Sequence, residues 1–233
     1  MTEFAVNPAC AARVIHVGVD AEPVLVVDDL LSDPDAVVRH AQQSGAFRKD
    51  ARDFYPGVRM PFSTAYAENV YRHLQALFAA TFGATRVEPL SCLLSLATTR
   101  PEELRPIQSV PHFDSFEAAH IAGVHYLCSE AFGGTSFYRH RSTGYEWIDA
   151  ARIGDYAPRL KAEVMGLNAR SFDYIRGDTT LFERTGSVAA KFNRAVFYRS
   201  HVLHSGDISG GDGLSEDPGQ GRLTANTLGV IRN

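Results

Sequence analysis

The spacing of apolar residues in the first part of the chain predicts two strands and two helices. Apolar and β-branched positions at 12–20 and 22–31 are typical of strands. The segment 31–45 combines capping residues, a proline suited to a first helical turn and a terminal glycine, which together predict a helix. A second helix is predicted at 66–83, where apolar residues recur at helical spacing. This apolar stripe consists of Val70, Leu74, Leu77 and Phe78.

From residue 86 onward the pattern changes to short apolar runs separated by glycine-bearing turns. Strands are expected at 86–99, 119–129, 134–140, 194–205 and 222–231. Within an insertion at about 141–190, the segment 149–167 has the pattern of a short helix instead. The polar, glycine-rich stretch 209–221 is expected to be a mobile loop.

This order of elements predicts one α+β, mainly β domain over residues 1–233. Residues 1–85 would supply the N-terminal strands and helices. Residues 86–233 would form an antiparallel sandwich or barrel as the core, interrupted by the insertion.

Composition and charge narrow the class of protein. The chain has 23 Lys and Arg against 27 Asp and Glu, a net charge of −4, so nothing recommends nucleic acid or an anionic membrane as a partner. No run of 18 apolar residues occurs, and the first residues lack the pattern of a signal peptide. The three widely separated cysteines suit a reducing compartment. We therefore expect a soluble, cytoplasmic protein.

The sequence SVPHFDSFEAAH at 109–120 contains a candidate pair of metal ligands. In an extended chain, side chains at i and i+2 leave the same face, so His112 and Asp114 would point the same way. A metal ion would use this pair if a third ligand came from elsewhere in the fold.

Position narrows the search for the third ligand among the other histidines. Three histidines lie before residue 86, and two of them, His40 and His73, are in expected helices among polar neighbours; those on the expected strands at 119–140 are most simply strand residues. His201 and His204 remain, on opposite faces if their strand is regular. His204 is favoured because it ends the expected strand at a rim, where ligands usually lie.

Two histidines and one carboxylate form the facial triad of non-haem iron(II) sites, although zinc can take the same ligands. Arg222 begins the final expected strand, eighteen residues after His204. An inward-pointing arginine would bind a dicarboxylate through its planar fork. Thr224 shares the face of Arg222 and could donate its hydroxyl to the same carboxylate.

The order of these residues resembles that of the iron(II)- and 2-oxoglutarate-dependent oxygenases. The segment 24–41 resembles the opening strand and helix common in that superfamily, and 125–140 resembles its strand, Gly-Gly turn and strand after the His-x-Asp pair. Within the superfamily, FNRAVFYRSHVLHSGD together with GRLTANTLG is most similar to the bacterial, prolyl-hydroxylase-like DUF6445 group.

The resemblance implies a double-stranded β-helix core, of the jelly-roll or cupin-like kind, with N-terminal supporting helices. It implies 2-oxoglutarate held at its distal carboxylate by Arg222, with Thr224 or Tyr126 as helpers. It also implies three iron(II) ligands, namely His112, Asp114 and His204.

The same resemblance implies a dioxygenase that uses 2-oxoglutarate and O2. Related halogenating enzymes lack the carboxylate that Asp114 provides, so hydroxylation is favoured. The substrate would be an amino acid, a peptide or a small metabolite. The insertion at 141–190 and the loop at 209–221 are where substrate selection is expected, because loops on a rigid sandwich commonly perform it.

Two alternatives stay open at this point. One is a non-catalytic, cupin-like protein that binds a small molecule or peptide, and whose cavity would lack an inward-facing Arg222. The other is a zinc or manganese enzyme on the same fold, which would require a fourth ligand such as His201. Tyr55 and Arg59 could also reach a substrate, but a turn packed on the core is the commoner role for such a segment.

Overall fold

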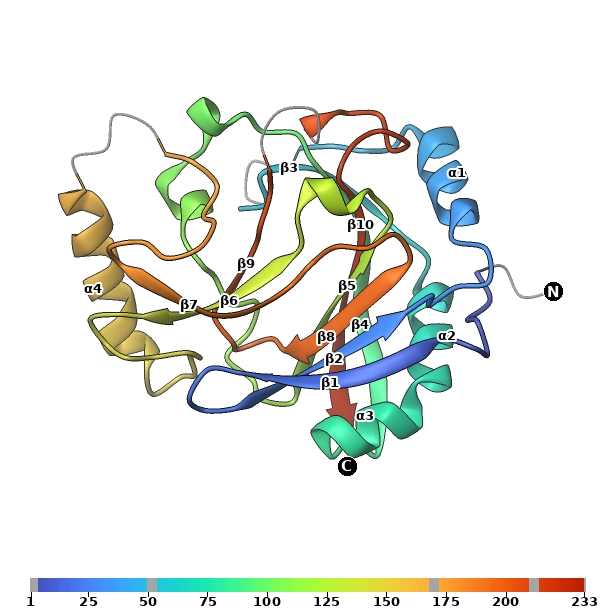
Figure 1. Ribbon diagram of the computed structural model, residues 1–233, viewed down its shortest axis with the longest axis horizontal. Coiled ribbons are helices and arrows are strands. Elements are labelled where there is room, and N and C mark those ends of the chain that lie inside the picture. Colours follow the sequence, from blue (N-terminus) through green and yellow to red (C-terminus); the bar gives the residue numbers. More distant parts are fainter. Residues whose placement is uncertain (1–3, 50–53, 168–171, 210–213, 233) are drawn as a thin grey trace.

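The computed structural model describes residues 4–49, 54–167, 172–209 and 214–232, and two antiparallel sheets dominate it. In this part of the chain the larger sheet has seven strands in the order β1-β2-β8-β5-β10-β4-β3 (Figure 1). Its strands span Ala11–Val17 (β1), Glu22–Asp28 (β2), Gly57–Pro61 (β3), Arg86–Ala97 (β4), His120–Tyr126 (β5), Arg194–Arg199 (β8) and Leu223–Arg232 (β10). The smaller sheet has the order β7-β6-β9, with strands Phe182–Val188 (β7), Thr135–His140 (β6) and His204–Gly206 (β9).

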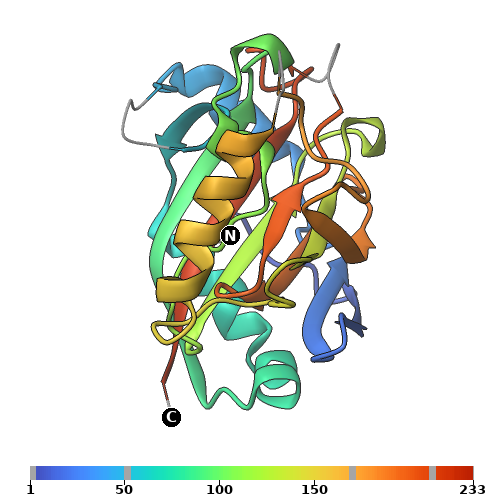
Figure 2. The ribbon, with the colours of Figure 1, turned by 90° about the vertical axis from the view of Figure 1, so that its left-hand side faces the viewer.

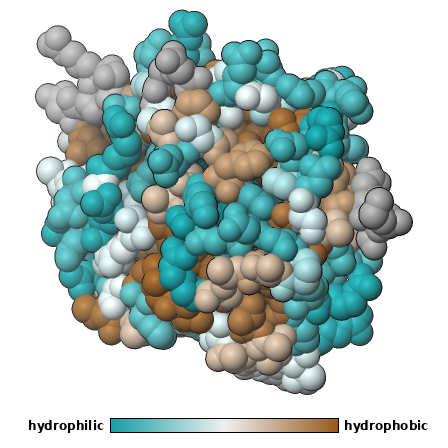
Figure 3. All heavy atoms as spheres, turned by 45° about the vertical axis from the view of Figure 1, so that its right-hand side comes forward, coloured by the Kyte–Doolittle hydropathy of each residue, from teal (hydrophilic) through white to brown (hydrophobic). Residues whose placement is uncertain are grey.

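Three helices cover one face of the larger sheet. They are α1 (Asp35–Ser44), α2 (Thr64–His73) and α3 (Gln75–Phe82). Apolar side chains of these helices and of the sheet form one core, in which Phe78 and Leu94 are fully buried. Gly45 and Gly83 end α1 and α3 in the left-handed conformation, which glycine adopts without steric cost. Hydrophilic residues cover much of this side of the molecule, with apolar residues in small patches between them (Figure 3).

The other face of the larger sheet looks toward the smaller sheet. A second core lies between the two sheets and includes Val26, Phe137 and Tyr198. Strand β2 has four consecutive fully buried residues, 24–27, because the helices cover one of its faces and the smaller sheet covers the other.

Strand register places a polar row on this second face. Ser95 of β4 pairs with Arg59 of β3 and with Thr224 of β10, and Thr224 also pairs with Tyr126 of β5. Directly paired residues of neighbouring strands share a face of the sheet. Tyr126 belongs to the core between the sheets, so Arg59, Ser95 and Thr224 lie on that inner face as well.

The remaining helix, α4 (Ile153–Gly166), lies at one side of the sandwich (Figure 2). Its buried residues Tyr156 and Leu160 pack with Tyr138 of β6 and Phe182 of β7. Short 3-10 helices at Pro101–Glu103 (η1), Pro106–Ser109 (η2) and Glu130–Phe132 (η3) complete the fold. None of the helices in the described residues combines the length and apolarity needed to cross a membrane.

Most of the expected elements are confirmed, including the mainly β, α+β class and the helix within the insertion. The single helix expected at 66–83 is wrong, because the chain breaks at Leu74 between α2 and α3. Strands β3 and β7 were not expected. Part of the expected loop at 209–221 lies outside the described residues, and residues 214–221 contain no strand.

The single strand expected at 194–205 is also wrong, and its break positions the candidate site. Strand β8 belongs to the larger sheet and β9 to the smaller one, so the chain crosses between the sheets at residues 200–203. Backbone hydrogen bonds fix the crossing: Ile148 N donates to the carbonyl of His201, and Leu203 N donates to that of Glu146. The crossing delivers His204 at the start of β9.

Candidate metal centre

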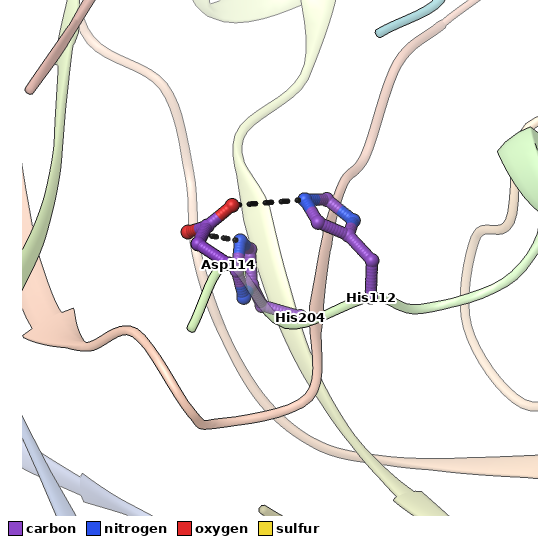
Figure 4. Close-up of side chains that lie close together, drawn as sticks. All are labelled: His112, Asp114 and His204. Atoms are coloured by element: carbon purple, nitrogen blue, oxygen red, sulfur yellow. Dashed lines mark ion pairs between the residues drawn. The ribbon is translucent and has the colours of Figure 1, made fainter. Parts of the chain in front are cut away.

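The structure brings His112, Asp114 and His204 together (Figure 4). Each offers one ligand atom, and these atoms all lie within 4.8 Å of one another. His112 Nε2 is 3.6 Å from Asp114 Oδ1, and His204 Nε2 is 3.5 Å from Asp114 Oδ2. The expectation that His112 and Asp114 point the same way agrees with this geometry.

Backbone pairing holds the three ligands in register. His112 N donates to the carbonyl of His204 at 2.9 Å, and His204 N donates back to the carbonyl of His112 at 2.8 Å. Asp114 N donates to the carbonyl of Ser200 at 2.8 Å. The segment that carries the His-x-Asp pair is therefore attached to both ends of the crossing between β8 and β9.

A hydrogen bond fixes the tautomer of His204. Its Nδ1 lies 2.9 Å from the carbonyl oxygen of Val202, which can only accept, so Nδ1 holds the hydrogen. The lone pair is then on Nε2, which faces Asp114. The ring of Tyr198 packs edge-on against the imidazole at 4.7 Å, which further restricts its orientation.

His112 is held in the neutral form that a metal requires. Burial chiefly lowers the pKa of His112 to about 4; the positive charges of Arg59 and of His204 when it is protonated add to the shift, and Asp114 opposes it. The side chain is nevertheless 54% accessible, because its accessible surface faces a cavity rather than packed protein. Ligand atoms must be both deprotonated and reachable, and His112 meets both conditions.

These three side chains fit a divalent transition metal. Two imidazole nitrogens and one carboxylate on one side of an ion leave positions open for other ligands. The two separations that involve Asp114, 3.6 and 3.5 Å, are close to those of groups that share one ion at about 2.0–2.2 Å. Iron(II) and zinc both accept this donor set.

His201 is not part of this group among the described residues. Its Nε2 lies 3.7 Å from Glu22 Oε1, and its ring stacks on Trp147 at 5.2 Å. A zinc or manganese site that needs His201 as a fourth ligand finds no support in this arrangement.

Arg222 and Thr224 line the same cavity as the three ligands. Arg222 is 4% exposed, and its Nη2 donates to the carbonyl of Gly134 at 2.9 Å. No carboxylate of the described residues forms an ion pair with Arg222, and its Nε has no hydrogen-bond partner there. A buried guanidinium in this state is suited to an anionic ligand.

Tyr126 lies next to Arg222 but does not line the cavity. The Arg222 Cζ is 5.9 Å from the centre of the Tyr126 ring, and the hydroxyl of Tyr126 shares a 2.6 Å hydrogen bond with Thr135 Oγ1. Tyr126 can therefore help to position the Arg222 side chain, but it does not face the cavity itself.

Tyr55 and Arg59 also line the cavity, although the sequence favoured a turn packed on the core. The Arg59 guanidinium stacks over the Tyr55 ring at 4.3 Å. Burial raises the pKa of Tyr55, while the positive charges of Arg222 and Arg59 oppose the shift. Their positions depend on β3 pairing with β4, and the only signal in the sequence was an aromatic residue and an arginine flanking Pro-Gly.

The cavity that these residues surround has a volume of about 640 Å³. It reaches from the three ligands and Arg222, between the sheets, to Tyr156 and Leu160 of α4. A volume of this size is typical of a small-molecule site.

Comparison with solved structures establishes the fold. The non-heme alpha ketoglutarate dependent epimerase SnoN from nogalamycin biosynthesis is 13% identical, with a TM-score of 0.52, and the match covers 90% of this chain and 79% of SnoN. HygX from Streptomyces hygroscopicus with nickel and 2-oxoglutarate bound is 12% identical, with a TM-score of 0.52 over 91% of this chain and 84% of HygX. The carbocyclase SnoK matches at 11% identity and a TM-score of 0.52, over 90% of this chain and 80% of SnoK.

These likenesses confirm the double-stranded β-helix core with supporting helices. No curated protein matches the chain. A family model described as a family of unknown function matches residues 8–228, nearly the whole sequence. The chain therefore belongs to the DUF6445 family.

Proposed function

We propose that the protein is a non-haem iron(II)- and 2-oxoglutarate-dependent dioxygenase that hydroxylates a small molecule or peptide. One observation supports this proposal above all. Two histidines and one aspartate with converging ligand atoms share a cavity with a buried arginine that has no carboxylate partner among the described residues. The family's fold is one on which SnoN, SnoK and HygX use or bind 2-oxoglutarate.

In this proposal His112, Asp114 and His204 hold iron(II). Arg222 and Thr224 bind the distal carboxylate of 2-oxoglutarate, and Tyr126 supports Arg222 from behind. Iron(II) with 2-oxoglutarate and O2 would supply the oxidising power needed to hydroxylate a C–H bond.

Backbone groups of the chain orient the residues that would bind the metal and 2-oxoglutarate, and the walls of the cavity limit access of water. Val202 keeps the lone pair of His204 on Nε2 through its carbonyl, so the imidazole is ready to bind the metal. Gly134 holds one nitrogen of Arg222 through its carbonyl, which leaves the rest of the guanidinium for a ligand. The sheets and α4 would hold a substrate beside the metal centre and limit the access of bulk water to it.

An anaerobic titration tests the proposal. Iron(II) and then 2-oxoglutarate are added to the protein, and the weak visible charge-transfer band of the chelate is measured. We expect a band in the wild type, its loss in His204→Ala and its weakening in Arg222→Ala. The matched control is His201→Gln, which removes the neighbouring histidine and should retain the band.

Two outcomes would contradict the proposal. Absence of a band at saturating iron(II) would favour a binding protein or another metal. Loss of the band in His201→Gln together with its retention in His204→Ala would assign the third ligand to the other histidine.

A further inference from the structure

The cavity walls beyond the metal ligands are mainly apolar and aromatic. They include Phe54, Ile107, Val110, Phe113, Leu160 and Tyr174. These residues come from four separate parts of the chain: the segment before β3, the η2 region with the His-x-Asp segment, α4, and the segment before β7. Such walls favour a ligand with a flat or bulky apolar body.

The apolar lining continues to the mouth of the cavity. Phe54 is 63% exposed and Ile107 is 44% exposed, and both line the cavity. Phe116 is 42% exposed, and its ring lies 5.1 Å from the ring of Phe113, which is also in the lining. Large apolar side chains gathered at a cavity mouth mark a binding surface more often than chance exposure.

The lining of the cavity has more positively charged than negatively charged side chains. Asp114 is the only acidic side chain among the described residues of its lining, and it belongs to the metal-binding group. The lining also contains two cations, Arg222 and Arg59, in the same cavity as the metal-binding group. A cationic group on a bound substrate would therefore lose water without gaining a carboxylate partner, which is costly.

We infer that the substrate is a small molecule with an aromatic or similarly flat apolar body and no cationic group. This inference rests on the proposed function for the reaction, and it narrows the substrate range implied there. Free amino acids, and peptides whose amine would have to enter the cavity, are excluded. The apolar body lies between the η2 region and Leu160 of α4, so the insertion at 141–190 contributes a wall of the substrate site through that helix.

Two probes with the same naphthalene ring, one neutral and one cationic, test the inference. The neutral probe is 2-naphthol, and the cationic probe is 2-naphthylmethylammonium. Binding is measured by isothermal titration calorimetry on the metal-free protein, and again anaerobically with iron(II) and 2-oxoglutarate. We expect 2-naphthol to bind about tenfold more tightly than the cation, or better.

Two variants locate the binding. Leu160→Trp fills the cavity and should abolish binding of 2-naphthol. Ile107→Glu places a carboxylate at the exposed mouth and should strengthen binding of the cation about threefold relative to its neutral control Ile107→Gln. The mouth variants keep the test decisive if Leu160→Trp fails to fold.

Each contrary outcome would overturn the inference: equal or tighter binding of the cation, no binding of either probe, or no difference between Ile107→Glu and Ile107→Gln. The chelate band in the same samples reports separately on the proposed function. If the band is absent while 2-naphthol is still preferred, the oxygenase proposal fails and the description of the cavity stands. If the band is present but 2-naphthol is not preferred, the oxygenase proposal stands and the inference about the substrate fails.

Discussion

The two faces of the seven-stranded sheet differ in how they are covered: one is packed against helices, and the other borders a cavity. On the face covered by α1–α3, aromatic and aliphatic side chains pack into one core, in which Phe78 and Leu94 have no exposed surface. On the face toward the smaller sheet, a cavity of about 640 Å³ remains beside the packed core. The first face provides stability, and the second is suited to ligand binding.

Two buried histidines, one on each face, differ in the partners of their ring nitrogens. His125, which contacts the helix side, has protein partners at both ring nitrogens: the Tyr66 hydroxyl at 2.8 Å and Asn193 Oδ1 at 3.1 Å. Within the described residues, the ring of His204 has a hydrogen-bond partner at Nδ1 alone, and its Nε2 faces the Asp114 carboxylate in the cavity wall at 3.5 Å. A histidine with both nitrogens satisfied is structural, whereas one with a directed lone pair is available to a metal.

The largest expected effect is on stability, from truncation on the filled face. Phe78→Ala removes a ring that lies 5.1 Å from Phe197 and 5.6 Å from Tyr71, and the packed surroundings cannot close the gap. We expect the free energy of unfolding, measured by urea denaturation, to fall by about 3–5 kcal/mol. The matched control is Phe54→Ala at the cavity mouth, where the loss should stay within about 0.5 kcal/mol. Equal losses in the two variants would remove the distinction between the faces.

The buried His125 on the helix-covered face should also make the free energy of unfolding depend on pH. Burial lowers the pKa of His125 to about 4, although a hydrogen bond with Asn193 opposes the shift. Below the ordinary histidine pKa of about 6.5, the unfolded chain binds a proton that the folded protein refuses until about pH 4. His125 should therefore cost stability progressively as pH falls through this window, by up to about 3 kcal/mol.

His125→Gln isolates this contribution. The variant should be less stable than the wild type near pH 7 by about 1–3 kcal/mol, because glutamine cannot reproduce both hydrogen bonds. Urea denaturation at several pH values should show the difference shrinking on acidification. A constant difference from about pH 7 to about pH 4 would contradict the assignment.

On the cavity face, the effects are expected in ligand binding rather than in stability. Arg222→Lys keeps the charge but loses the planar fork, so 2-oxoglutarate should bind about 10- to 100-fold more weakly in the anaerobic titration. Arg199→Lys is the matched control, because Arg199 pairs with Glu22 at 3.3 Å and does not line the cavity. Unchanged affinity in Arg222→Lys would mean that another group holds the distal carboxylate.

The local parts of this site could be predicted from the sequence. The i, i+2 spacing predicted that His112 and Asp114 point the same way, and turn residues together with strand periodicity predicted most elements. The break at Leu74 could not be predicted in this way, because no glycine or proline marks it. Strand β7 was missed because FERTGSV has few apolar residues and only its two ends are buried.

The site residues that are positioned by pairing between distant strands could not be predicted from the spacing of apolar residues. Tyr55 and Arg59 reach the cavity because β3 pairs with β4, a strand far along the chain in which Ser95 is the partner of Arg59. His204 faces His112 and Asp114 because the chain changes sheets at residues 200–203. The spacing of apolar residues had predicted one continuous strand at 194–205 instead. The preference for His204 as a metal ligand, derived from its place at a rim and from family resemblance, stays a prediction that the titration of His204→Ala tests.

The smallest expected effect concerns space around Arg222. A Cβ on Gly206 would lie 3.3 Å from Arg222 Nη2 and equally close to Ile208 Cγ1, tighter than most contacts of a real side chain. Because the crowded atom of Arg222 is the end of a flexible side chain, Gly206→Ala should change the free energy of unfolding by less than about 1 kcal/mol.

The same substitution should weaken 2-oxoglutarate binding about two- to fivefold, since a guanidinium moved by a few tenths of an ångström aligns less well with a carboxylate. Gly154→Ala in α4 is the control, because a Cβ there meets nothing within 4 Å. Its ligand affinity should stay at the wild-type value. If Gly206→Ala instead lost stability and kept its affinity, the region around Arg222 would be part of the packed structure, and the contrast between the two faces would not extend to it.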